Sequence, residues 1–401
     1  MTASSDLTGD PIVITGAART PMGGFQGALR EVAAPALGSV AIAAALSRAG
    51  VAAGDIDEVI MGCVLAAGMG QAPARQASLG AGLPEAVGCT TVNKMCGSGM
   101  KATMLAHDGL RAGSGRVMVA GGFESMSNAP YLLDRAREGY RMGHGRLLDH
   151  MFVDGLEDAY DKGKLMGSYA EDTAGHYQFT REAQDEFAIE SLRRAKAAIE
   201  DGSFAGEVAP VTVPTRKGEH LVERDEQPLT ADVERIPKLR PAFREGGTVT
   251  AANSSSISDG AAALVLMRRS EAERRGLEPL AEIVGHASHA RAPAWFTTAP
   301  IGAIETLFEK TGWRAGDVDL YEINEAFAVV TMAAMRELDL DHGRVNVHGG
   351  ACALGHPVGA SGARIVVTRL AAMAKNDVKR GVAALCIGGG EATAIAVERT
   401  R

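Results

Sequence analysis

The apolar and polar positions of this chain form blocks that predict strands alternating with helices. Short, mostly apolar runs, typical of strands buried inside a sheet, lie at residues 12–14, 59–65 and 116–120. Runs with helical spacing lie at 35–50, 74–79 and 100–110. This alternation predicts an α/β fold in which buried strands are largely parallel.

The block from residue 125 to about 247 departs from this pattern. Charged residues and glycines become more frequent, and apolar periodicity weakens outside an amphipathic helix expected at 181–201 and a strand-and-turn pattern at 210–222. We expect this block to be an inserted loop domain that covers part of the rest. The predicted organisation is an N-terminal half at 1–124, completed by about 248–276, the insertion at 125–247, and a C-terminal half at 277–401.

The last third of the chain repeats the order of the first third. Residues 317–321 resemble 55–59, residues 345–347 resemble the run at 92–93, and residues 384–391 align with 117–124. Similar segments at offsets of roughly 250 to 270 residues predict a duplicated α/β unit. Two such halves would bring equivalent strand ends together, where ligand sites of α/β sheets form.

Composition and charge narrow the class of protein. The chain has 401 residues, 46% hydrophobic and 22% charged, which is typical of a soluble globular protein with large cores. A formal net charge of -8 argues against nucleic acid or an anionic membrane as partner. The first residues lack the basic start and apolar core of a signal peptide, and no apolar run is long enough to span a membrane. Five cysteines without CxxC or zinc spacing predict a reducing, cytoplasmic location and no metal.

The first candidate for chemistry is Cys96, at a corner between a strand-like run and a helix-like run. Small residues follow it at 97–99 and leave the amides of the helix N-terminus free. Those amides and the helix dipole are expected to lower the pKa of the thiol, which would make Cys96 a nucleophile. A buried structural cysteine is the alternative for this residue alone.

Two later stretches of the sequence favour the nucleophile over the structural cysteine. His356 stands between Gly355 and Pro357 just before a helical pattern, and Cys386 ends a strand-like run before three glycines. Alone, the first could be a hydrogen-bonded loop histidine and the second a packed strand cysteine. Because all three residues follow strand patterns beside glycines, together they predict a catalytic set.

Five motifs in order resemble the thiolase family: NKMCGSGMK, GGFESMSNAP, NEAFA, GGACALGHPVGASGAR and CIGGG. The resemblance runs from Ile12 almost to the C-terminus and implies a duplicated five-layer α/β/α/β/α fold with an inserted loop domain. It also implies acetyl-CoA C-acetyltransferase activity, the Claisen condensation of two acetyl-CoA into acetoacetyl-CoA and CoA, and the reverse thiolysis. Coenzyme A thioesters would be substrates, and no cofactor is expected.

The same resemblance assigns roles to the candidate residues. Cys96 would carry the acetyl group, and His356 would activate its thiol as a base or an imidazolium partner. Cys386 would remove a proton from the α-carbon of the second acetyl-CoA. One oxyanion site would use His356 with a water held by Asn324, and the other the N–H groups of Cys96 and Gly388. Asn324 could instead simply cap the helix expected to start near residue 325.

Contacts to coenzyme A are also implied by the resemblance. They are Ser255 at the pantetheine arm, Met166 and Phe296 in the acyl pocket, and Arg235 with Lys238 near the nucleotide. Leu165 and Leu229 stand where many relatives carry His and Arg, which leaves the nucleotide contacts open. His348 is expected near the site, and Cys352 is expected to line it without reacting.

Residues 135–149 resemble the segment that ties family dimers into tetramers, which predicts a homotetramer. Two other activities stay open: a 3-ketoacyl-CoA thiolase of broader chain length, and a β-ketoacyl synthase-like condensing enzyme. The synthases carry His where Cys386 stands, which argues against the second. An inactive scaffold of the same fold is a third alternative. The bulk of Met166 and Phe296 favours short acyl groups.

Overall fold

Two sheet halves built to the same plan form the frame of the molecule, and a computed structural model describes residues 9–216 and 218–400 of it. The N-terminal half contains, in spatial order, β1 (Ile12–Arg19), β10 (Ser258–Arg268), β5 (Val117–Ser125), β3 (Glu58–Gly62) and β4 (Gly88–Val92). The C-terminal half contains β11 (Ala281–Ala290), β14 (Glu391–Arg399), β13 (Arg380–Ile387) and β12 (Leu320–Ile323). Only two residue pairs join β1 to β11, so the halves meet at a narrow seam.

Strand pairing bears out the predicted duplication. Strand β3 runs parallel to β4 and β5, and β12 runs parallel to β13, with a parallel bridge from Tyr321 to Val345 at the place of β4. The remaining pairs of both halves are antiparallel. A register irregularity recurs at the same place, between Ile14 and Gly16 in β1 and between Ile283 and Gly285 in β11. The sheet is therefore mixed, rather than largely parallel as the pattern predicted.

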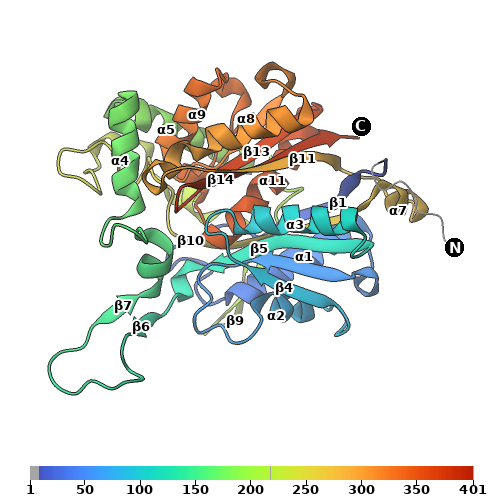
Figure 1. The fold of residues 1–401 in the computed structure, drawn as a ribbon, viewed down its shortest axis with the longest axis horizontal. Coiled ribbons are helices and arrows are strands. Elements are labelled where there is room, and N and C mark those ends of the chain that lie inside the picture. The colour runs from blue at the N-terminus through green and yellow to red at the C-terminus, as the bar shows by residue number, and fades with distance from the viewer. Residues whose placement is uncertain (1–8, 217, 401) are drawn as a thin grey trace.

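Helices separate the two halves and cover their outer faces, which gives five layers (Figure 1). Helices α1 (Ala34–Ala49) and α2 (Pro73–Gly80) cover one outer face, and α8 (Ala299–Thr311) and α9 (Ala328–Glu337) the other. Helices α3 (Ser98–Ala112) and α11 (Val358–Lys375) fill the centre. Three apolar cores, one in each helical layer, hold these contacts together.

Glycines allow α3 and α11 to pack closely. A Cβ on Gly99 would lie 2.8 Å from the backbone nitrogen of Ala363, and one on Gly362 would lie 2.4 Å from that of Met100. Because both glycines are near the helix N-termini, the loops that precede the two helices are drawn together. Those loops carry Cys96 and His356.

The segment between residues 125 and 247 is built from short elements around two longer helices. These are β6 (Tyr131–Leu133), β7 (Leu147–Asp149), α4 (Met166–Tyr177), α5 (Arg181–Glu200), β8 (Val211–Thr215), β9 (Gly218–Val222) and α6 (Glu226–Thr230). The β6–β7 hairpin projects from the body in Figure 1. A wholly buried cation ties this segment to β1: the Arg19 guanidinium bonds Glu207 at 2.5 Å and Asp225 at 2.7 Å.

The remaining elements are short. They are β2 (Gly23–Gly24), α7 (Arg269–Arg274), α10 (Ala351–Leu354), the 3-10 turns Ala53–Asp55, Met126–Asn128, Val233–Lys238, Pro293–Thr298, Ala315–Asp317 and His342–Arg344, and a π-helical turn Phe152–Leu156. Among the helices of the described residues, none has both the length and the apolar character that a bilayer crossing requires.

Candidate active site

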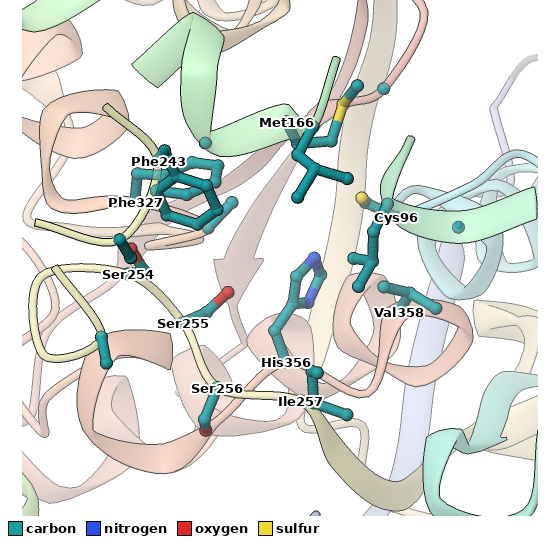
Figure 2. A pocket seen from close by; sticks show the side chains of 18 of the residues that line it. Cys96, Met166, Phe243, Ser254, Ser255, Ser256, Ile257, Phe327, His356 and Val358 are labelled. Atoms are coloured by element: carbon teal, nitrogen blue, oxygen red, sulfur yellow. The ribbon is translucent and has the colours of Figure 1, made fainter. Parts of the chain in front are cut away.

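A largely apolar cavity of about 430 Å³ gathers residues from both halves and from the 125–247 segment (Figure 2). Its lining includes six of the residues singled out in the sequence: Cys96, His356, Gly388, Ser255, Met166 and Phe296. Cys386 is fully buried in the wall beside it, in one cluster with Phe296 and Phe327, and its thiol is close enough to Cys96 to interact electrostatically. The structure therefore brings the two thiols and the imidazole together.

The corner that carries Cys96 is held by its own short hydrogen bonds. The Lys94 N–H donates to Ser98 Oγ at 2.8 Å, and the Ser98 hydroxyl donates to the Met95 carbonyl at 2.6 Å. Met95 adopts a φ of 48°, a left-handed conformation that costs energy in a non-glycine residue. A Cβ on Gly97 would lie 2.4 Å from Ile387 Cδ1, so this glycine lets the corner approach the end of β13.

The pKa of the Cys96 thiol differs from the expectation. The N–H groups of Gly388 and of Cys96 itself point at Sγ and lower its pKa, as helix N-terminal amides should. Burial outweighs them and raises the pKa above its ordinary value. The prediction of a lowered pKa was therefore wrong in sign, and the resting group is a neutral thiol.

His356 presents an unprotonated nitrogen to the cavity. Its Nδ1 lies 2.6 Å from Ser361 Oγ, and that hydroxyl donates to the Pro357 carbonyl at 3.0 Å, which assigns the ring proton to Nδ1. Nε2 has no partner among the described residues. Burial, helped by the nearby Arg364, lowers the pKa of His356 to about 3. In Figure 2 the ring points into the cavity toward Cys96.

Asn324 carries an amide donor that is unpartnered within the described part of the chain, and it stands two residues before Ala326, which lines the cavity. It follows β12, its backbone N–H donates to the Ala384 carbonyl at 3.0 Å, and its Oδ1 faces Arg364 at 3.5 Å. Its Nδ2 is buried without a partner among the described residues. The next helix, α9, has Phe327 as its N-cap, so the alternative that Asn324 caps this helix was wrong.

Cys386 is protected from water at the end of β13. Burial, followed by repulsion from Cys96, raises the pKa of its thiol well above the ordinary value. The glycines after it turn the chain away, since Gly389 and Gly390 have φ of 95° and 93°. The backbone N–H of Gly388 is left facing Cys96.

Four of the residues expected to contact coenzyme A line two adjoining hollows, whereas Lys238 lines neither of them. Figure 2 shows the Ser255 side chain directed into the cavity, while its N–H donates to the Ala326 carbonyl at 2.9 Å. Phe296 packs edge-on against Tyr169, with 6.3 Å between ring centroids. Arg235 lies outside the cavity, in an adjoining hollow of about 270 Å³ that shares Gln227 and Ala251 with it.

Two expected neighbours of the site lie elsewhere. His348 lines a separate polar hollow and packs edge-on against Phe204, and the prediction that it lies near the site was wrong. Cys352 lines the hollow of Arg235 and directs its thiol to the Glu325 carbonyl at 3.7 Å. His348 lies within the segment 346–350, and Cys352 follows it in α10.

The sequence reasoning missed two supporting residues. One is Ser361, five positions after His356, which holds its Nδ1. The other is Glu124, which is wholly buried near the C-terminal end of β5. Its carboxylate accepts the N–H groups of Val64, Leu65 and Gly359 at 2.9 to 3.0 Å. Burial raises the pKa of Glu124 to about 7. An acidic residue at the end of an apolar strand pattern was the signal that could have found it.

Known families and proteins match this chain over nearly its full length. The family model described as Thiolase, N-terminal domain matches residues 12–270, and the model Thiolase, C-terminal domain matches residues 277–399. The chain is 50% identical to an acetyl-CoA acetyltransferase of Pseudomonas aeruginosa, over 97% of this chain and 99% of that one. It is 52% identical to acetyl-CoA acetyltransferase 2 of Arabidopsis thaliana, over 96% of each.

Solved structures give the same result. The Acat5 thiolase of Ascaris suum, in complex with coenzyme A, has a TM-score of 0.91 and 42% identity, over 97% of this chain and all of that one. The acetyl-CoA acetyltransferase of Bacillus anthracis has a TM-score of 0.95 and 41% identity, over 97% of this chain and 99% of that one.

Proposed function

Because this chain belongs to the thiolase family, we propose that it is an acetyl-CoA C-acetyltransferase. It transfers the acetyl group of one acetyl-CoA to the α-carbon of a second, giving acetoacetyl-CoA and free CoA, and it catalyses the reverse thiolysis. The observation that carries this proposal is the convergence of two thiols and one imidazole base at a single apolar cavity.

The first half-reaction acetylates Cys96. Nε2 of His356 takes the thiol proton as Sγ attacks the thioester carbonyl, and the C–S bond to coenzyme A then breaks. The proton passes from Nε2 to the departing CoA sulfur, so charge balances. The N–H groups of Cys96 and Gly388 point at Sγ, to which the carbonyl carbon becomes bonded, and this supports assigning them to the negative charge that develops on the carbonyl oxygen. One such donor contributes on the order of 3 kcal/mol to the transition state.

The second half-reaction forms the carbon–carbon bond. The Cys386 thiol gives its proton to Nε2 of His356, and the resulting thiolate removes a proton from the α-carbon of the second acetyl-CoA. The carbanion then attacks the acetyl group on Cys96. Cys96 leaves as thiolate and takes the proton from Nε2 of His356, which releases acetoacetyl-CoA and returns all three groups to their resting protonation states. The free Nδ2 donor of Asn324 supports the assignment of a bound water there, which would face the enolate oxygen together with a protonated Nε2 of His356.

Short acyl groups are the proposed substrates. Phe296, Phe327 and Met166 line the cavity and pack in one apolar cluster with Cys386, which supports a short acyl pocket there. Steady-state thiolysis of 3-ketoacyl-CoA substrates of increasing length tests this: we expect kcat/KM to fall sharply beyond acetoacetyl-CoA. Equal rates for long chains would favour the alternative of a thiolase with broad chain-length specificity.

Assembly and location also belong to the proposal. The projecting β6–β7 hairpin exposes Tyr131, Leu133, Met142 and Leu147, which supports a homotetramer built as a dimer of dimers. Analytical ultracentrifugation tests it, and a dimer at micromolar concentration would contradict it.

A cytoplasmic location is supported by five free cysteines and the absence of zinc or CxxC spacing. No dissociable cofactor is proposed, since coenzyme A thioesters are the substrates.

A further inference from the structure

Two histidines and an aspartate converge at the end of α3 that is far from Cys96. His107 and Asp108 belong to α3, and His286 belongs to β11. His107 Nδ1 lies 3.1 Å from Asp108 Oδ1, and His286 Nε2 lies 2.9 Å from the same oxygen. The two imidazole rings meet edge-on with 4.9 Å between centroids. Three potential metal ligands thus come from both halves of the fold.

The spacing of these atoms suits a divalent cation. One ligand atom from each residue lies within 4.8 Å of the other two. Histidine and carboxylate ligands lie about 2.0 to 2.2 Å from Zn²⁺, so pairs of ligands on a tetrahedral ion are separated by roughly 3.4 Å. The observed separations of 2.9 and 3.1 Å need only a small opening to admit the ion.

The two imidazoles of the cluster are shielded, while the carboxylate reaches the surface. His107 and His286 have side chains only 8% and 15% exposed, whereas Asp108 is 54% exposed and leaves one side open to water. An ion at this position would therefore be held by two largely buried imidazoles and would keep access to water.

We propose that His107, Asp108 and His286 bind a divalent cation of the Zn²⁺ class, with water completing its coordination. Mixed imidazole and carboxylate ligands also suit Co²⁺ and Ni²⁺. Two cations are nearby: Arg111 on the same helix, and Lys310, whose Nζ donates to the His286 carbonyl at 3.1 Å. They weaken cation binding without occupying the ligand atoms. A bound ion would link α3 to β11 and therefore to the C-terminal half. The N-terminus of α3 follows Cys96.

Titration of the chelator-treated, full-length protein with Co²⁺ tests the proposal. We expect one equivalent to bind with visible d–d absorption and no intense thiolate-to-metal band, because no cysteine takes part. Asp108→Asn and His286→Ala should each weaken binding at least tenfold, while thiolysis activity without metal should stay unchanged. His289→Ala, on the same strand but outside the cluster, is the matched control and should bind as the unsubstituted protein does.

A second measurement separates this site from binding at the catalytic thiols. Zn²⁺ should raise the melting temperature of the unsubstituted protein and of Cys96→Ala, but not of Asp108→Asn. Equal Co²⁺ affinity in His286→Ala and the unsubstituted protein would overturn the proposal. So would a thiolate charge-transfer band, or no saturation at millimolar Co²⁺.

Discussion

At the scale of single residues, two opposite pKa shifts determine how the reaction must begin. Burial raises the pKa of the Cys96 thiol and lowers the pKa of His356 to about 3. Both groups are therefore neutral near pH 7, and the thiol is activated by proton transfer during attack rather than held as a resting thiolate–imidazolium pair. The sequence indicated the helix N-terminus beside Cys96, but the extent of burial that reverses its effect depends on distant segments.

The pH dependence of Cys96 acetylation follows from the His356 shift. A histidine that resists protonation stays a competent base as the pH falls through about 6.5, where an ordinary imidazole titrates. We expect kcat/KM for acetylation by acetyl-CoA to show no acid limb between about pH 5 and 7. Rapid-quench mass spectrometry of the acetyl-enzyme measures it. A limb centred near pH 6.5 would mean that the imidazole is not shielded as described.

The lowered pKa of His356 also makes the folded protein less stable as the pH falls. The folded-state pKa of His356 lies below its unfolded value, so protons bind the unfolded chain first as the pH falls from about 6.5 toward 3. His356→Gln removes this effect. Relative to that variant, the native protein should lose about 1 to 2 kcal/mol of unfolding free energy between about pH 7 and 5, as measured by urea unfolding.

Ser361 is expected to position His356 rather than to react. Its hydroxyl accepts from Nδ1 while donating to Pro357, so Ser361→Ala should free the ring and let either nitrogen carry the proton. We expect kcat for thiolysis to fall roughly 10- to 100-fold with little change in KM. Ser361→Thr keeps the hydroxyl and should recover most of the activity. A loss of the same size in Ser361→Thr would point to packing instead.

At the scale of elements, the close approach of α3 and α11 is what brings the two catalytic loops together. Gly99→Ala would place a Cβ 2.8 Å from the Ala363 backbone, and overpacking of this kind costs about 1 to 3 kcal/mol. We expect a lower melting temperature and slower acetylation of Cys96. Gly175→Ala, in α4 with nothing within 4 Å of the added Cβ, is the matched control and should be neutral or stabilising.

Glu124 joins three elements whose ends surround the site. Its carboxylate accepts N–H groups that follow β3 and that begin α11. Glu124→Leu leaves those buried donors without partners and should cost several kcal/mol, at about 1 to 3 kcal/mol for each unsatisfied group. Glu124→Gln keeps one acceptor oxygen and should cost less. Differential scanning calorimetry of the two variants measures this order, and equal melting temperatures would contradict it.

Element prediction from the sequence worked where patterns were periodic. The helices expected at 35–50, 74–79 and 181–201 lie within one or two residues of α1, α2 and α5. Strand β10 was missed because its alanine-rich run, Gly260 to Ala263, is as compatible with a helix as with a strand. It forms a strand because β1 and β5 lie on either side of it, and pairing across more than a hundred residues is invisible to local pattern.

At the scale of the whole molecule, duplication is what makes the chemistry possible. The loop before α3 carries Cys96 and the equivalent loop before α11 carries His356, while Cys386 lies near the end of β13, which pairs with β12 as β5 pairs with β3. The motifs identified the reactive residues, whereas supporting residues such as Ser361 carried no distinctive pattern. These supporting residues were identified from the three-dimensional arrangement.

The division of labour between the two thiols is the central claim, and it is tested most directly by mass spectrometry of two variants incubated with acetyl-CoA. Cys386→Ala should still accumulate one acetyl group, on Cys96, while forming no acetoacetyl-CoA. Cys96→Ala should accumulate none at the active site. An acetyl group found on Cys386 in the unsubstituted protein, or condensation by Cys386→Ala at the normal rate, would contradict the account.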